Sequence, residues 1–328
     1  MTAGQPSGAQ VVALGGRHGL AASLQALTRV TSALTAVVTV ADDGGSSGRL
    51  REELDLLPPG DLRMALCALA AGDGWARSWQ TLLQHRFPGR GPLAGHAVGN
   101  LLLAGLADTE GGMVEALELV GQLIGARGRV LPASLVPLRI VAQVLGANLR
   151  DPGAVSRVVG QVAVATTPGV VMSVSLEPEQ PPACEQAVAA VLAADVVVLG
   201  PGSWFTSVLP HLLVPGLRDA LVRTAATRVV VLNLAEQTGE TAGYSPQAHL
   251  EVLAAHAGDL VPDVVLADEQ AVLDTRGLMS AVEAAGGRLV LCPIALGDGT
   301  PRHDPVRLAA AYQLILSDLT QTRGPAWR

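Results

Sequence analysis

The chain has 328 residues, of which 49% are apolar and 16% are charged, and its formal net charge is −7. This composition excludes a wholly disordered chain. An acidic balance without any basic block also argues against a protein that holds nucleic acid through the phosphate backbone. All 22 basic residues are arginine, so neither a P-loop lysine nor a Schiff-base lysine is available.

The cysteines and the N-terminus indicate a cytoplasmic protein. Cys67, Cys184 and Cys292 lie far apart and form neither zinc-ligand spacing nor a disulfide framework. The first ten residues lack the basic and apolar regions of a signal peptide. No apolar run approaches the roughly 20 residues that cross a bilayer, so we expect no membrane span.

Short apolar runs alternate with helical patterns along the chain. The runs are continuous rather than alternating, as expected for parallel strands covered on both faces. They occupy residues 10–14, 34–41, 195–200, 227–234, 262–267 and 287–292, and helical patterns occupy roughly 18–30, 61–72, 97–108, 185–194, 247–257 and 306–320. The alternation predicts a Rossmann-like, doubly wound α/β fold with a mostly parallel sheet and helices on both faces.

The middle of the chain follows another pattern. Residues 110–160 are predicted to be helix interrupted by Gly and Pro, and residues 161–178 to be two strands around a TTPG turn, paired at the sheet edge. We therefore expect one α/β domain over residues 1–328, with a helical and β-hairpin insertion over about 110–180. The final QTRGPAWR is predicted to fray.

Two of the predicted strands are followed by glycine-rich turns that lead into a helix. Ligands of open parallel sheets bind beyond the carboxyl ends of the strands. Glycines let backbone N–H groups approach a phosphate there, and a helix N-terminus favours negative charge. The candidate residues are Gly15, Gly16, His18 and Gly19 after the first strand and Gly200, Gly202 and Ser203 after the third. A tight turn without a ligand remains the alternative for the first of them.

The second strand is followed by VADDGGSSGRLR, where Asp42 and Asp43 adjoin glycines and serines. The two carboxylates suit Mg²⁺ held together with substrate phosphates. They also suit hydrogen bonds from a ribose or a base. Ser46 and Ser47 can cap the next helix, and Arg49 can reach a phosphate. An Asp-Gly turn with helix capping is the alternative that needs no ligand.

Further polar candidates lie on helices and on later loops. Asp61 opens a helix in PPGDLR, and His96 and Asn100 are four residues apart, hence on one helical face. A helix-start histidine satisfied by its surroundings is the alternative for His96. Later loops carry weaker candidates, namely Asn233, Glu236, Glu240 and Tyr244 in NLAEQTGETAGYS and Arg302, His303 and Asp304 in GDGTPRHDP.

Several of these stretches together resemble one known family. GGRHGL, VADDGGSSGRLREEL, PPGDLR, LAGHAVGNLLLA, GPGSWFTSVLPHLLVPGL, GETAGYS and RHDP, between residues 15 and 305, resemble the YvcK-type gluconeogenesis factor family. That family is a branch of the superfamily that includes 2-phospho-L-lactate transferase. The resemblance implies a Rossmann-like body with one crevice. In the transferase branch this crevice holds a deazaflavin precursor and a guanylylated phospholactate, assisted by Mg²⁺.

For the YvcK-type branch, the resemblance implies a site for a nucleotide sugar, chiefly UDP-N-acetylglucosamine. GETAGYS and RHDP are associated with this ligand there, which makes Tyr244 and Arg302 ligand-binding candidates. One residue departs from the family pattern: the first loop usually reads GGG, and Arg17 replaces the third glycine. Arginine adopts positive φ only at a cost. Either the position does not need positive φ, or Arg17 adds a phosphate contact.

The resemblance thus implies a regulatory protein that binds a nucleotide sugar and supports cell shape and cell-wall precursor supply during gluconeogenic growth. Its expected partners are the nucleotide sugar and cell-wall synthesis proteins. The alternatives are a Mg²⁺-dependent transferase of a phosphorylated group and a cell-shape scaffold with an idle nucleotide site. A homodimer is expected because symmetric oligomers are common.

Overall fold

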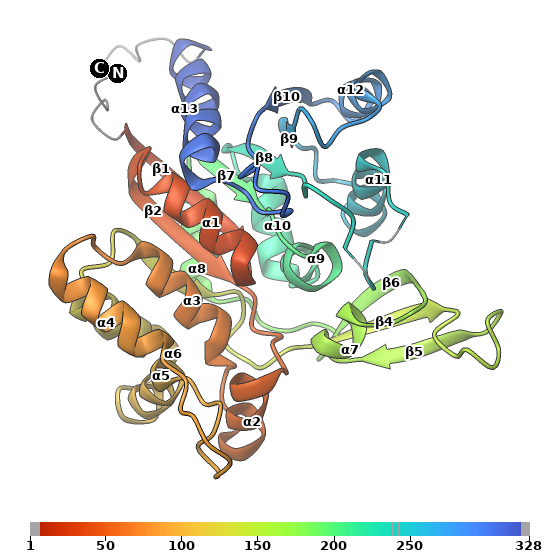
Figure 1. Ribbon diagram of the computed structural model, residues 1–328. Helices are drawn as coiled ribbons and strands as arrows, with labels where there is room; N and C mark the ends of the chain where they lie inside the picture. The colour runs from red at the N-terminus through yellow and green to blue at the C-terminus, as the bar shows by residue number, and fades with distance from the viewer. Residues whose placement is uncertain (1–6, 238, 242, 323–328) are drawn as a thin grey trace.

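The structure is a computed structural model that describes residues 7–237, 239–241 and 243–322 (Figure 1). Its centre is a parallel sheet in the order β10-β9-β8-β7-β1-β2-β3. The strands are β1 Ser7–Gly15, β2 Thr31–Val38, β3 Arg129–Pro132, β7 Val196–Leu199, β8 Thr227–Val231, β9 Val264–Asp268 and β10 Arg288–Cys292. This confirms the predicted α/β fold and a strand within each of the six predicted runs.

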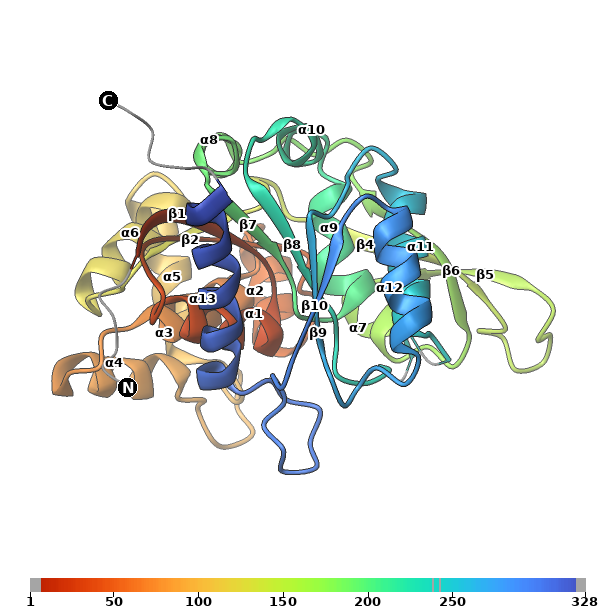
Figure 2. The same cartoon turned by 90° about the horizontal axis from the view of Figure 1, so that it is seen from above.

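Helices cover both faces of this sheet. Figure 2 shows α1 and α13 on one side and α8 and α10 on the other. The helices of the main body are α1 Arg17–Leu27, α2 Gly45–Leu54, α3 Pro59–Leu69, α4 Gly74–Gln84, α5 Val98–Thr109, α6 Met113–Leu123, α8 Glu185–Ala193, the π-helix η1 Trp204–Val208, α9 Leu209–Leu212, α10 Pro215–Arg223, α11 Pro246–His256, α12 Thr275–Ala284 and α13 Pro305–Thr322. Because both faces are covered, central strands such as β7 and β9 are buried along their whole length, which explains their continuous apolar runs.

A second sheet of three antiparallel strands projects from the body (Figure 1). It has the order β5-β4-β6, with β4 Arg139–Leu145, β5 Val155–Val159 and β6 Val170–Glu177, and helix α7 Gln161–Ala165 joins β5 to β6. The predicted hairpin over 161–178 was therefore wrong in its first half. Asp43 Oδ1 accepts a hydrogen bond from the backbone N–H of Val162 at 3.0 Å, so a distant carboxylate satisfies one of the free N–H groups at the start of α7.

The segment 110–160 also differs from its prediction. Only α6 is helical over a long stretch, and β3, β4 and β5 follow it. The short strand β3 adds to the edge of the main sheet beside β2. The predicted tail lies outside the described residues from position 323 onward. Within the described ranges, no helix is long and apolar enough to cross a membrane.

The strand order places the switch point of the sheet between β1 and β7. From β1 the chain continues outward through β2 to β3, and from β7 it continues in the opposite direction through β8 and β9 to β10. The loops after β1 and β7 therefore leave the sheet on either side of one crevice at its carboxyl edge. This is the place where open α/β sheets bind ligands.

Candidate functional site

The turns after β1 and β7 touch each other through their backbones. A Cβ added to Gly19 would lie 2.3 Å from the carbonyl oxygen of Pro201 and 2.7 Å from Cα of Gly202. Gly202 itself has a φ of 154°, a conformation that side chains rarely adopt. Glycine at these positions is therefore required by the close approach of the two turns.

A cavity of about 360 Å³ opens at this junction. Its lining includes Gly16, Arg17, His18 and Gly19 from the first turn, Pro201, Gly202 and Ser203 from the second, Asn233, Glu236, Gln237 and Glu240 after β8, and Pro301 and His303 before α13. Helix α1 begins here, and its first N–H groups lack intrahelical partners. The cavity thus combines helix-start donors with amide and carboxylate side chains.

The loop after β8 holds the turn after β7 in place. Asn233 accepts a hydrogen bond from Gly202 N at 3.1 Å and donates one to Gly202 O at 2.9 Å. The buried carboxylate of Glu240 accepts hydrogen bonds from Ser203 Oγ, from Thr206 Oγ1 at 2.7 Å and from Phe205 N at 3.1 Å. The sequence placed Asn233 and Glu240 in a candidate loop, but their support of this turn could not be foreseen.

Asp42 and Asp43 reach toward different elements. Asp42 Oδ1 accepts from Gly44 N at 3.1 Å within its own loop, and Oδ2 would lie 2.8 Å from a Cβ on Gly60. Asp43 binds the start of α7 and packs against Gly160. Among the described residues, no group of three or more His, Cys, Asp and Glu is arranged to hold a metal ion. Since Mg²⁺ needs only one or two carboxylates beside phosphates, Asp42 fits such a role better than Asp43.

Ser46 joins the second loop to His96 and Asn100. Its Oγ lies 3.0 Å from His96 Nδ1 and accepts a hydrogen bond from Asn100 Nδ2 at 3.0 Å. All three side chains are buried, and burial, with Arg49 nearby, lowers the pKa of His96 below its usual value. The sequence predicted these residues as separate candidates, and the structure brings them together at the start of α2.

Ser47 and Arg49 have structural contacts in this arrangement. Ser47 is buried, and its Oγ would lie 2.3 Å from a Cβ on Gly60, so α2 packs closely on the start of α3. The guanidinium of Arg49 donates to the backbone oxygens of Pro92 at 3.1 Å and Ala94 at 2.7 Å. Arg49 therefore clamps the loop before α5, and its predicted phosphate contact stays a prediction.

Asp61 is a buried carboxyl with a free oxygen. It is 4% exposed, its Oδ2 has no hydrogen-bond partner, and its other contacts include the backbone N–H of Arg17. Burial, reinforced by the negative charge of Asp42, raises the pKa of Asp61 to about 7. A Cβ on Gly16 would lie 2.8 Å from Oδ2, so this carboxyl lies directly beside the first turn.

Arg17 adopts the conformation that a glycine would favour. Its φ is 54°, so the position does need positive φ. The guanidinium Nη2 donates to Gln161 Oε1 at 2.6 Å, and Gln161 Nε2 donates to Thr206 O at 3.2 Å. Gln161 is fully buried. Arg17 thus ties the first turn to α7, a contact that the sequence did not predict.

Tyr244 and Arg302 do not line the 360 Å³ cavity. The Tyr244 hydroxyl donates to Val171 O at 3.2 Å, and its ring packs edge to face on Phe205 and His249. Arg302 is exposed and forms no ion pair with a described residue. Its neighbour His303 does line the cavity. Burial lowers the pKa of His303 to about 4, and its Nε2 has no partner in the described chain.

Comparison with known proteins decides the family. The family model of the 2-phospho-L-lactate transferase CofD matches residues 11–285. The gluconeogenesis factor of Listeria monocytogenes is 38% identical over 325 residues. This match covers 96% of this chain and 98% of the Listeria protein. The chain belongs to the gluconeogenesis factor family. A family relative from Mycobacterium tuberculosis is 54% identical over 305 residues, covering 92% of this chain and 88% of its own.

A solved structure supports the same conclusion. The crystal structure of a UPF0052 family member from Bacillus halodurans superimposes with a TM-score of 0.82 at 33% identity. It covers 93% of this chain and 98% of the other. The fold of that family member therefore extends over nearly the whole chain.

The predicted site residues form two neighbouring groups, and four of them belong to neither group. The first group lines the cavity and comprises Gly16, His18, Gly19, Gly202 and Ser203, with Gly15 and Gly200 in the turns behind them. The second comprises Asp42, Asp61, Ser46, Ser47, His96 and Asn100 at the starts of α2, α3 and α5. Asp43 and Arg49 contact α7 and the loop before α5, and Tyr244 and Arg302 lie away from both groups. The ligand contacts of these four residues stay predictions.

Proposed function

We propose that the protein binds a nucleotide sugar, with UDP-N-acetylglucosamine as the first ligand to test, and acts as a regulator of cell-wall precursor supply and cell shape. The observation that carries this proposal is the cavity at the switch point, where two glycine turns, the start of α1 and the polar loop after β8 meet. Its volume of about 360 Å³ lies within the range of small-molecule sites. Membership in the gluconeogenesis factor family supports the regulatory role.

The arrangement suits a diphosphate linked to a nucleoside. The N–H groups of His18 and Gly19 at the start of α1 would meet the diphosphate, where the helix dipole adds to their attraction. Gln237 lines the cavity and would contact the base or ribose with its amide N–H groups, whereas the Asn233 amide is already bonded to Gly202 and Gln237. Arg302 lies next to lining residues and would reach the outer phosphate.

Mg²⁺ fits this site through one protein carboxylate. Asp42 is half-buried, its charge acts on Asp61 beside the first turn, and its Oδ2 accepts no hydrogen bond from a described residue. The metal would be held by Asp42 and the ligand's phosphates, and it would neutralise phosphate charge. Asp42 would otherwise repel a diphosphate, so its position makes Mg²⁺ dependence an expected property of binding.

Calorimetric titration of the full chain tests the proposal. UDP-N-acetylglucosamine and GDP are titrated with and without Mg²⁺, and we expect micromolar binding of the UDP sugar only. Arg302→Ala should weaken that binding, while Arg276→Ala, at an exposed arginine in α12, should not. No binding of the UDP sugar, or a preference for GDP, would contradict the proposal.

A second candidate is a transferase of a phosphorylated group. It is favoured by the match to the 2-phospho-L-lactate transferase family model and by Asp61, whose raised pKa and free oxygen suit a proton acceptor. Incubation with guanylylated phospholactate, a deazaflavin acceptor and Mg²⁺, followed by mass spectrometry, tests it. Product formation that Asp61→Asn abolishes would establish transfer, and the absence of product would remove this candidate.

A further inference from the structure

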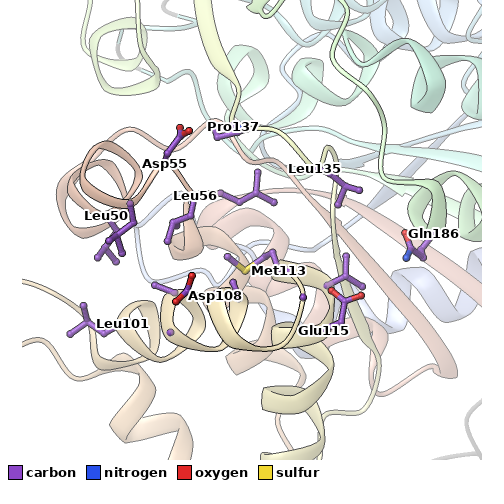
Figure 3. A pocket seen from close by; sticks show the side chains of 18 residues that line it. Leu50, Asp55, Leu56, Leu101, Asp108, Met113, Glu115, Leu135, Pro137 and Gln186 are labelled. Atoms are coloured by element: carbon purple, nitrogen blue, oxygen red, sulfur yellow. The ribbon is translucent and has the colours of Figure 1, made fainter.

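A larger cavity lies away from the crevice, between α2, α5, α6 and the segment 135–137. Its volume is about 780 Å³. Figure 3 shows Leu56 and Met113 near its centre, Leu50 and Leu101 at one end and Leu135 at the other. This cavity shares no lining residue with the 360 Å³ cavity at the switch point. It is therefore a separate site.

The depth of the cavity favours a narrow occupant. Leu50 and Met113 are only 4% and 6% exposed, whereas Leu135 at the rim is 49% exposed. An apolar chain could reach the buried leucines, but a flat protein surface would touch only the rim. Cavities of this volume, with mostly apolar walls and a few polar groups, are typical of small-molecule sites.

The ionisable side chains that line the cavity are all acidic. Among the lining residues that the structure describes, the ionisable side chains are Asp55, Asp108 and Glu115. Asp55 lies in the field of Arg51, and Glu115 lies in the first turn of α6, where the helix dipole favours an anion. Two of the three carboxylates therefore have compensating partners.

Asp108 is an exposed carboxylate that has no compensating positive charge. It lies in the last turn of α5, which contains no basic residue and where the helix dipole is negative. It forms no ion pair with any described residue. A cation with N–H donors would satisfy Asp108 and meet the carbonyl end of α5 at once.

We propose that this cavity binds a small amphiphilic amine, with its apolar chain against the leucines and its ammonium group at Asp108. Burial of each CH₂ group would tighten binding by about fourfold. An anionic ligand of the same length would face the three lining carboxylates and the negative end of α5, and Glu115 already occupies the positive start of α6. The site thus selects for charge as well as for apolar surface.

Octylamine is the probe and octanoate the matched anion, each titrated into the full chain by calorimetry. We expect octylamine to bind at one site and octanoate to bind about tenfold more weakly or not at all, the difference expected from a charge-assisted hydrogen bond. Octanoate binding as tightly as octylamine, or no octylamine binding, would overturn the proposal.

Two variants test whether the ligand binds in this cavity. Gly105 lines the cavity, lies inside α5, and has nothing within 4 Å of an added Cβ, so Gly105→Phe should fill the space without strain and abolish binding. Gly74→Phe is the control, because Gly74 also has open space but lies in α4. Asp108→Asn should weaken the binding of octylamine by about tenfold. It should leave the binding of octanoate unchanged or make it tighter. Equal octylamine binding by Gly105→Phe and the wild type would refute the location.

Discussion

Replacing Gly19 with alanine tests the contact between the turns after β1 and β7. Inside a helix, alanine is more stable than glycine by about 0.5–1 kcal/mol. Here its Cβ would lie 2.3 Å from Pro201 O and 2.7 Å from Gly202 Cα, and neither backbone atom can rotate away. Overpacking of this kind costs about 1–3 kcal/mol. The clash outweighs the helix preference, so we expect Gly19→Ala to lower the free energy of unfolding by about 1–2 kcal/mol.

Urea denaturation followed by circular dichroism measures this change, with Gly105→Ala as the matched control. Gly105 also lies inside a helix, but an added Cβ meets nothing within 4 Å, so the control should be more stable than the wild type by about 0.5–1 kcal/mol. Opposite signs for the two variants would support the contact. A Gly19→Ala protein that unfolds at the same or a higher urea concentration than the wild type would show that the turns are not in contact.

Three further substitutions test the site. The pKa of Asp61 in the folded protein, about 7, lies above its usual 3.8, so ionisation of Asp61 lowers the free energy of unfolding as pH rises from about 4 to 7. Asp61→Asn should remove a few kcal/mol of this pH-dependent loss of stability. The difference between the urea midpoints at pH 5 and pH 8 measures it. Arg17→Gly should leave the free energy of unfolding within about 1 kcal/mol of the wild type, because relief of positive φ offsets a lost hydrogen bond. It should also speed amide exchange at residues 161–165, and unchanged exchange would contradict the contact between Arg17 and Gln161. Ser46→Ala should cost about 1–3 kcal/mol in urea denaturation, because it leaves Asn100 Nδ2 buried without its partner, and a neutral result would refute that role.

Strands with long apolar runs could be predicted from the sequence, and short or half-exposed strands could not. Residues 11–14 and 264–267 of these runs are buried on both faces, and that burial produces the continuous Val, Ala and Leu pattern. Strand β3 has only four residues, and β5 is exposed or half-buried along its length. Neither gives a signal that stands out from neighbouring glycines and prolines.

The candidate site was predictable where it depends on turns and unpredictable where it depends on distant partners. The glycines around Gly19 and Gly202 indicate close backbone approach in their own sequence. By contrast, the roles of Arg49 and Gln161 depend on partners more than 40 residues away, at Ala94 and Arg17. No local pattern distinguishes an arginine that binds a phosphate from one that clamps a loop.

The strand order also determines when the central strand β1 can pair with its neighbours during synthesis. The central strand β1 is made first, but its neighbour β7 begins only at Val196, after the small sheet and seven described helices of the body have been synthesised. Until then one side of β1 carries unpaired N–H and C=O groups beside an apolar surface. At translation rates of roughly 5–20 residues per second, this edge stays open for about ten seconds or more. The nascent chain is therefore most exposed to aggregation before the crevice exists, and the completion of the ligand site coincides with the closure of that edge.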